Sequence, residues 1–325
     1  MTDQPAVSEA LQSVAIGAYS LDRPRWVRAL RWLGRFYRTK RAGAAGLTVT
    51  VAIIVIGIIG PSVVPYGKDD VFSQPNPKYD INSFEPDALS TTIFARLSGP
   101  SRDHPFGTDD KGRDLFTRII LGARLSLQVG LAASALATIF GAIIGLTSGY
   151  FGGVFDLVVQ RIVDAMIAIP SLVLLLLLVQ VAEPSLKITI LALTVLGTFG
   201  ASRVIRAATL SVRNDMYIEA ARVVGATPFR IIFRHVLPNI TAPIIIIFTI
   251  SIGGNILAES GLAFLNLGVQ GPSWGAMVNT GRQFLDSKPA MSLISGGAIT
   301  VTVLAFNLLG DALRDVFDPR QRGTK

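Results

Sequence analysis

The sequence predicts an all-α membrane protein with six transmembrane helices. Hydrophobic residues make up 50% of the 325 residues, a larger share than in an ordinary soluble domain. These residues are gathered into runs of roughly 20, the length that crosses the hydrocarbon core of a bilayer. Basic residues flank the runs, as they do at the ends of membrane spans. We therefore take lipid to be the solvent of most of the chain.

The chain divides into five predicted regions. An N-terminal cytoplasmic region contains a basic amphipathic helix over 23–41, which either lies on anionic lipid or anchors the following span. No short apolar run with a cleavage site begins the chain, so we expect the first span to stay as an anchor. The five regions are the N-terminal region 1–43, the first transmembrane helix 44–65, an external polar segment 66–120, a membrane core 121–313 and a cytoplasmic tail 314–325.

The membrane core contains the other five predicted spans. Pro170 is expected to kink the third of the six spans. Gly253, Gly254 and Asn255 are expected to loosen the fifth, and a break there could line a passage. The five spans of the core are 123–150, 158–181, 187–208, 240–257 and 291–309.

The distribution of lysine and arginine predicts the orientation. The segments 23–41, 203–234 and 314–325 carry eight, six and four of these residues, whereas the two short turns on the other side carry one and two. Basic residues concentrate in short cytoplasmic loops. Both termini and the 203–234 segment are therefore predicted to be cytoplasmic, with the long segment 66–120 outside.

Two side-chain patterns predict packing within the spans. Small residues recur every fourth position from Ala133 to Gly153, which places a smooth stripe on one helix face and predicts a closely packed neighbouring helix. Arg161 and Asp164 stand three apart on the third span and are expected to pair with each other.

Composition excludes several function classes. The net charge of +8 could indicate nucleic-acid binding, but the basic residues flank apolar runs and lack the interleaved aromatic residues of a base-stacking surface. With no cysteine, disulfides, iron–sulfur clusters and thiolate zinc sites are ruled out. The two histidines, His104 and His235, fall on opposite sides of the predicted membrane.

The segment 212–238 is a charged stretch between two apolar spans, and its sequence predicts two short helices. Asn214 or Asp215 is a candidate cap for the first helix, and Gly225 supplies the backbone freedom that ends it. The Thr227-Pro228 pair begins the second helix with a cap and a first-turn proline, and Pro238 is expected to stop it. Read without any family pattern, this hairpin could be a solvated loop whose arginines set the topology.

The spacing within this hairpin resembles the EAA loop of ATP-binding-cassette importer permeases, written EAA-x3-G-x9-I-x-L-P. His235 stands where that pattern has isoleucine. In the family, this hairpin docks into a cytoplasmic ATPase subunit, and small side chains with one carboxylate suit such a contact. The resemblance makes Glu219, Ala220, Ala221, Gly225, Leu237 and Pro238 the candidate ATPase-coupling residues.

Three further stretches resemble the dipeptide, oligopeptide and nickel branch of these permeases. The run 104–127, HPFGTDDKGRDLFTRIILGARLSL, matches the signature before the second helix, and 259–275, ESGLAFLNLGVQGPSWG, matches a second one. The DPR of the tail, 318–320, is a third.

The aspartates of the first run suggest a metal site, but their spacing fits neither calcium nor zinc ligation. We identify no metal, cofactor or catalytic residue in the sequence.

The resemblance implies a type I permease fold, with one N-terminal helix outside a five-helix core. It also implies a second homologous permease, one fused or two separate ATP-binding subunits that hold ATP and Mg, and an extracytoplasmic binding protein that delivers di- or oligopeptides. Nickel, glutathione or haem cargo remains open, because the branch shares its motifs. The expected location is the plasma or inner membrane.

Energy must come from those partners, because the chain has no phosphate-binding loop. The only Gly-Lys pair, Gly67 and Lys68, is followed by aspartate, and G-x-S-x-G and H-E-x-x-H motifs are missing as well. The chain is therefore predicted not to be an enzyme. A self-contained channel or secondary transporter is the rival reading, but it needs ionisable residues deep in the spans, and those are few.

Overall fold

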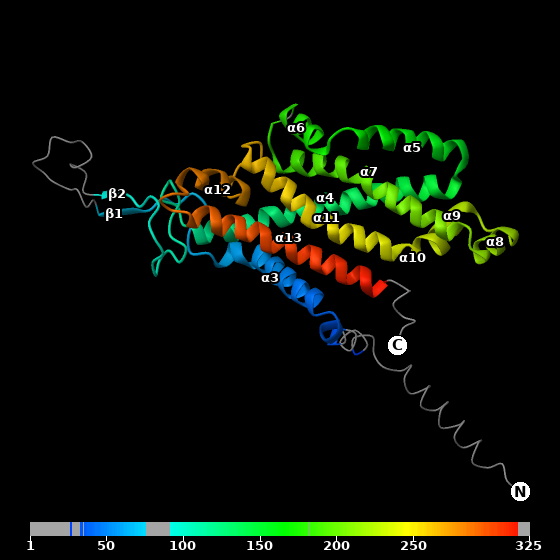
Figure 1. The fold of residues 1–325 in the computed structure, drawn as a ribbon, viewed down its shortest axis with the longest axis horizontal. Coiled ribbons are helices and arrows are strands. Elements are labelled where there is room, and N and C mark those ends of the chain that lie inside the picture. The colour runs from blue at the N-terminus through cyan, green and yellow to red at the C-terminus, as the bar shows by residue number, and fades with distance from the viewer. Residues whose placement is uncertain (1–26, 28–32, 35, 76–91, 182, 318–325) are drawn as a thin grey trace, which may run out of the picture.

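The structure is a computed structural model that describes residues 27, 33, 34, 36–75, 92–181 and 183–317 (Figure 1). Most of the predicted basic amphipathic helix at 23–41 and the tail from residue 318 lie outside the described residues. Long helices run side by side along the axis of an elongated bundle, and a small pair of strands lies at one end of it (Figure 1).

Five of the described helices are long and apolar enough to cross a membrane. They are α3 (Arg41–Val63), α4 (Leu115–Phe151), α7 (Leu186–Arg213), α11 (Thr241–Phe264) and α13 (Ala290–Phe317). A sixth crossing requires α5 (Gly153–Ala168) and α6 (Ser171–Val181) to act as one span. The predicted all-α membrane class is confirmed, and five of the predicted spans are single helices.

Shorter elements complete the described chain. They are β1 (Ser73–Pro75), β2 (Thr92–Phe94), α8 (Met216–Val223), α9 (Pro228–Ile231), the π-helix η2 (Ile232–Val236), α10 (Leu237–Asn239), α12 (Trp274–Gly281) and the 3-10 turn η3 (Arg282–Phe284). The two strands pair antiparallel, with Gln74 opposite Ile93.

The kink predicted at Pro170 is a break that divides the third predicted span into two helices. α5 and α6 meet at an angle of 84°. A proline disfavours helical backbone in the residue before it and has no N–H to donate. Ile169 accordingly adopts an extended conformation, with ψ of 127°, and α5 ends there.

The fifth span shows the opposite deviation, since the loosening expected at Gly253–Asn255 is not found. α11 continues as a helix through these residues to Phe264. Gly253 faces α13, where an added Cβ would lie 3.3 Å from the carbonyl oxygen of Val303. Asn255 donates from Nδ2 to Ser134 Oγ at 2.8 Å. Glycine thus serves helix packing here and does not break the helix.

The small-residue stripe of α4 packs against α7, as the spacing predicted. A Cβ on Gly145 would lie 2.6 Å from the carbonyl oxygen of Ser202, and one on Gly141 would lie 3.0 Å from the Ser202 nitrogen. Side chains larger than hydrogen therefore cannot be placed between these two backbones. The stripe ends earlier than expected, because Gly153 lies beyond α4, with φ of +59° and no atom near its would-be Cβ.

Ion pairs join α5 to α7, and the predicted pair of Arg161 with Asp164 is wrong. Asp164 pairs with Arg203 of α7 at 2.5 Å. Arg206 holds Asp156 with two parallel hydrogen bonds, 2.6 Å from Nε and 2.5 Å from Nη2. Sequence spacing indicated a contact within one helix, but the partner helix offers arginines that reach the carboxylates in a better geometry.

Arg206→Gln is expected to destabilise the protein by about 1–3 kcal/mol, because it leaves the Asp156 carboxylate without its cation. The Asp156 and Arg206 side chains are only 13% and 28% exposed, so water compensates poorly. The melting temperature of the purified protein in detergent measures the effect. Arg203→Gln is the matched control, since that pair is about half exposed and should contribute under about 1 kcal/mol. Equal losses in the two variants would contradict the assignment.

Aspartates hold together the segment that precedes α4. Asp109 accepts hydrogen bonds from the backbone of Lys111 and Arg113 and pairs with the Arg113 guanidinium at 2.7 Å. Asp114 caps α4 by accepting from the Thr117 nitrogen at 2.7 Å, which explains why the helix already begins at Leu115. Two of the carboxylates that suggested a metal site, Asp109 and Asp114, therefore make structural contacts. Within the described ranges, no group of three His, Cys, Asp or Glu could hold a metal ion.

Candidate functional site: the helical hairpin

The hairpin is formed by α8 and the helical stretch from α9 to α10, at the end of the bundle opposite the strands (Figure 1). Of the two candidate caps, Asp215 occupies the N-cap position of α8, although its side chain makes no cap hydrogen bond. Gly225 has φ of +84°, a left-handed conformation that glycine adopts at no cost. Thr227 caps α9 by accepting from the Arg230 nitrogen, and Pro228 is the first helical residue. The two-helix reading with a glycine turn is confirmed.

Pro238 does not stop the second helix, contrary to the prediction. The chain forms the π-helix η2 and then α10, in which Pro238 lies in the first turn, and α11 begins at Thr241. The Leu237 nitrogen bonds to the Ile232 carbonyl, one residue farther back than in an α-helix. This wider turn just before the proline accommodates its ring, which would otherwise clash with a carbonyl of the preceding turn.

An isoleucine-rich core fastens the hairpin to the bundle. The hairpin contributes buried side chains from α8, α9 and η2, and α4 and α7 contribute the other side of the same cluster. Its buried members are Leu146, Tyr150, Ala201, Ile205, Ile218, Ile231, Ile232, Val236 and Ile240. These buried side chains pack the hairpin directly against α4 and α7.

The six candidate coupling residues separate into two groups. Glu219, Ala220, Gly225 and Pro238 are exposed, whereas Ala221 and Leu237 are half-buried against the isoleucine-rich core. An added Cβ on Gly225 would meet no atom within 4 Å, so the turn is open on its outer side. The sequence pattern therefore combines residues that face outward with residues that hold the hairpin in place.

The hairpin surface carries large apolar side chains that the sequence analysis did not predict. We call them the tip patch; its members are Met216, Val223, Val224, Phe229 and Phe233, which are 85%, 87%, 87%, 71% and 51% exposed. The Phe229 and Phe233 rings contact each other, with centroids 4.4 Å apart and planes inclined by 38°. The apolar residues of this otherwise polar stretch were the available signal, since exposed apolar groups that cluster mark interaction surfaces.

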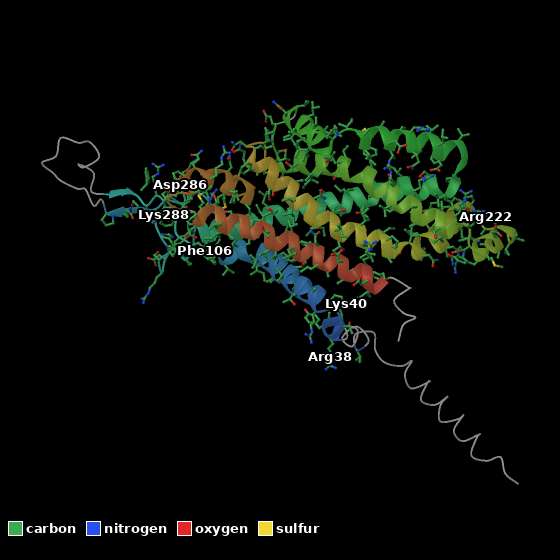
Figure 2. All side chains as sticks on the ribbon, viewed as in Figure 1. Arg38, Lys40, Phe106, Arg222, Asp286 and Lys288 are labelled. Atoms are coloured by element: carbon green, nitrogen blue, oxygen red, sulfur yellow. The ribbon has the colours of Figure 1, made fainter. Side chains whose placement is uncertain are left out.

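Aromatic contacts support the base of the hairpin. The Arg222 guanidinium lies over the Tyr150 ring, 5.5 Å from its centroid, and Figure 2 shows Arg222 at the hairpin end, far from Asp286 and Lys288. The Tyr217 ring is 6.5 Å from that of His235, the residue that departs from the EAA pattern. Burial and the nearby Asp215 charge raise the pKa of the Tyr217 phenol.

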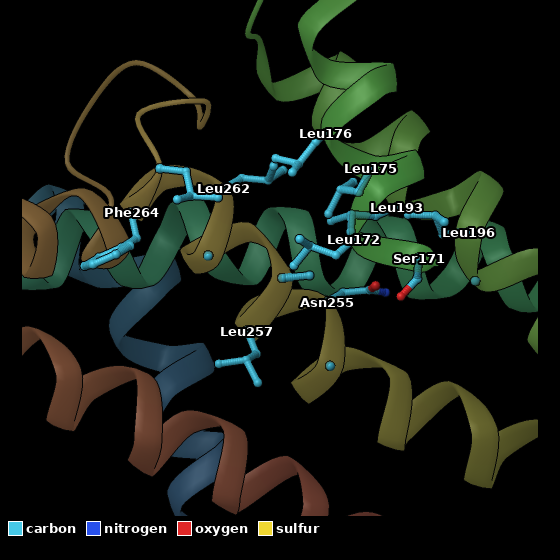
Figure 3. A pocket seen from close by; sticks show the side chains of 15 residues that line it. Ser171, Leu172, Leu175, Leu176, Leu193, Leu196, Asn255, Leu257, Leu262 and Phe264 are labelled. Carbon is cyan, nitrogen blue, oxygen red and sulfur yellow. The ribbon is translucent and has the colours of Figure 1, made fainter. Parts of the chain in front are cut away.

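A cavity of about 680 Å³ lies between α6, α7 and α11 (Figure 3). Leucines form most of its wall, and Ser171 and Asn255 contribute the polar side chains among its lining residues. Gly254 and Gly261 of α11 also line it. The Gly254-Asn255 pair was expected to line a passage through a helix break, but it borders this cavity from an unbroken helix.

Comparison with known proteins places these features in one family. A family model described as "Binding-protein-dependent transport system inner membrane component" matches residues 137–323. The dipeptide transport system permease protein DppC of Alkalihalophilus pseudofirmus is 39% identical over 90% of this chain and 90% of its own length. The oligopeptide transport system permease protein OppC of Bacillus subtilis is 35% identical over 88% of each chain.

Two further similarities bear on cargo and fold. The glutathione transport system permease protein GsiD of Escherichia coli is 34% identical over 96% of this chain and 98% of its own length. A solved structure of the MetNI methionine ABC transporter, in inward facing conformations, superposes with a TM-score of 0.52 and 19% identity, over 62% of this chain and 97% of that one. At that identity the likeness shows a shared fold. The chain belongs to the family of inner-membrane components of binding-protein-dependent transport systems, in the dipeptide and oligopeptide branch of ATP-binding-cassette importer permeases that its motifs predicted.

Proposed function

We propose that this chain is one of two permease subunits of an ATP-driven importer of di- and oligopeptides, and that its hairpin is the docking element for an ATPase subunit. The observation that carries the proposal is the hairpin itself: an apolar tip patch projects from the bundle, while the isoleucine-rich core joins its base to α4 and α7. A surface that is apolar outside and rigidly connected inside suits the transfer of motion from a partner to membrane helices.

In this proposal the partner contacts α8 where its side chains are small. Ala220 and Gly225 leave the backbone accessible, Glu219 offers a directional charge, and the tip patch supplies apolar area for burial. Ala221 and Leu237 then couple the docked surface to the bundle. ATP and Mg would be held by the partner subunits, one fused or two separate, and closure of those subunits would switch the path between two packed arrangements.

The cargo proposal rests on the branch to which the chain belongs. Relatives named for dipeptide and oligopeptide transport align over about nine tenths of the chain, and a relative named for glutathione transport aligns nearly as well. We favour di- and oligopeptides over glutathione, nickel or haem, and we expect an extracytoplasmic binding protein to make most of the selection.

The proposed orientation places both termini and the hairpin in the cytoplasm. The beginning of α3 and the end of α13 are tied together by an ion pair of Lys40 with Asp315 at 2.7 Å, and these two helix termini lie toward the hairpin side of the bundle (Figure 1). The basic residues of the flanking segments favour the cytoplasm for this side. Regions 1–43, 44–65, 66–120, 121–313 and 314–325 remain the proposed domains, with the protein in the plasma or inner membrane.

Reconstitution tests this function directly. Tagged chain purified from native membranes is expected to bring with it a second permease and an ATPase subunit, and proteoliposomes of that complex should accumulate trialanine only with ATP and a binding protein. Proteoliposomes containing this chain alone should accumulate none, because it has no ATP site of its own. Uphill uptake by the chain alone, or a stable solitary pore in native extracts, would favour the transporter or channel reading instead.

A further inference from the structure

Glu259 is a buried carboxylate at the end of the bundle opposite the hairpin. It lies in the last turns of α11 and is 0% exposed. Its hydrogen-bond partners among the described residues are three serine hydroxyls: Ser126 and Ser260 donate to Oε2 at 3.1 and 3.4 Å, and Ser273 donates to Oε1 at 3.0 Å. Nothing in the proposed coupling at the hairpin uses this group.

These partners join three elements. Ser126 belongs to α4, Ser260 to α11, and Ser273 is the N-cap residue of α12. A serine at an N-cap ordinarily accepts a hydrogen bond from its own helix, but the Ser273 side chain makes no such cap bond. Its hydroxyl donates to Glu259 instead. The beginning of α12 is therefore oriented by a carboxylate on α11.

Close contacts of Trp274 and Gly275 hold the beginning of α12 against α4 and α11. The Trp274 indole nitrogen donates to the Ile119 carbonyl at 2.9 Å, and a Cβ on Gly122 would lie 2.6 Å from Trp274 Cδ1. A Cβ on Gly275 would lie 1.9 Å from the Ser260 carbonyl oxygen. We call Ser126, Glu259, Ser273 and Trp274 the outer latch, because together they hold α12 against α4 and α11.

Stability alone is a poor explanation for this arrangement. Removing a carboxylate from water costs several kcal/mol, and a well-packed apolar side chain of similar volume is often at least as stable. Hydroxyls that converge on a carboxylate are directional, so they select one geometry of the three elements. The latch is therefore suited to positioning α12 and the loop that leads into it.

That loop, residues 265–273, connects α11 to α12 at the end of the molecule that carries the strands, and Leu265, Asn266 and Gln270 in it are exposed. The α11 turn that holds Glu259 also supplies Gly261 and Leu262 to the cavity wall. In the orientation proposed above, this end faces the binding protein. We propose that Glu259 is a positioning residue whose latch holds α12 and the loop 265–273 in the arrangement on which the loaded binding protein docks; this rests on the proposed function.

The first test measures ATPase activity of the reconstituted complex against the concentration of binding protein loaded with trialanine. Ser273→Ala and Ser126→Ala each remove one donor and should raise the half-saturating concentration about 3–10-fold, because the docking-competent arrangement becomes less populated. The maximal rate should not change. Glu259→Gln, which keeps one oxygen acceptor, should fall in the same range. Ser295→Ala is the matched control, since within the described part of the chain that buried hydroxyl donates to the Met291 carbonyl of its own helix, and it should leave both parameters unchanged.

The second test follows α12 itself and does not depend on transport. The chain has no cysteine, and Met277 of α12 is 2% exposed, so Met277→Cys adds a single shielded thiol. In the Ser273→Ala and Ser126→Ala backgrounds, a membrane-impermeant maleimide should modify this thiol about tenfold faster than in the Ser295→Ala background.

Two results would overturn the proposal. One is a lower maximal rate with an unchanged half-saturating concentration, which is the outcome of a purely structural role. The other is a thiol that reacts equally fast in latch and control backgrounds. Failure of the unmodified complex to take up trialanine would count against the proposed function, and the thiol measurement would still decide whether Glu259 positions α12.

Discussion

Gly225→Leu and Ala220→Trp are each expected to reduce ATP-driven uptake at least about 100-fold, while the protein still inserts in the membrane. Both residues are exposed on the hairpin, so the added side chains point to the docking surface. An interface that must bury these positions loses its close contact, and loss of a central contact commonly costs 2 kcal/mol or more, roughly 30-fold, before the transmission of motion is affected. Uptake by proteoliposomes and the amount of inserted protein are measured together.

Two controls separate docking from folding. Gly225→Asn keeps a residue that tolerates the left-handed backbone and should retain most of the activity, because φ of +84° suits asparagine better than leucine. Ile58→Trp adds comparable bulk to an exposed position of α3, away from the hairpin, and should transport normally. Uptake at the unmodified rate by Ala220→Trp would show that the hairpin does not dock a partner at this face.

Gly145→Leu is expected to abolish folding of the membrane core. The new Cβ would lie 2.6 Å from the Ser202 carbonyl oxygen and 2.9 Å from the Arg206 nitrogen, and backbone atoms of a packed helix cannot move aside as a flexible side chain can. Extra methylenes in a packed core cost about 1–3 kcal/mol even where side chains can rearrange. Here two helices must move apart, and we expect the free-energy cost of that separation to exceed the free energy of unfolding of the whole domain. The expected result is loss of monodisperse protein on size exclusion in detergent.

Gly297→Leu is the matched substitution for this test. It lies within α13, and an added Cβ there would meet no atom within 4 Å, so the helix should keep its packing. Its yield and melting temperature should stay close to those of the unmodified protein. If Gly145→Leu behaved like Gly297→Leu, α4 and α7 could not be as closely packed as described.

Much of the candidate site was predictable because its signals are local. Caps, a glycine turn and a first-turn proline depend on a few neighbouring residues, and Thr227, Pro228 and Gly225 adopt the predicted conformations. Pro238 was misread because its effect depends on the turn before it, and a π turn there lets the helix continue. Hydropathy marks the residues of the tip patch as apolar, but only the packed hairpin shows that they are exposed.

The sequence by itself determined the membrane class, the positions of the apolar helices, the hairpin and the family, since all of these follow from run length, period and local motif. Only the tertiary structure decided which groups meet across helices. It paired Asp164 with Arg203 instead of Arg161, and it brought Ser126 and Ser273 to Glu259. The physical reason is that hydrogen bonds and ion pairs act over about 3 Å. The residues that make them here are far apart in the sequence and come within that distance only when the helices pack into the bundle.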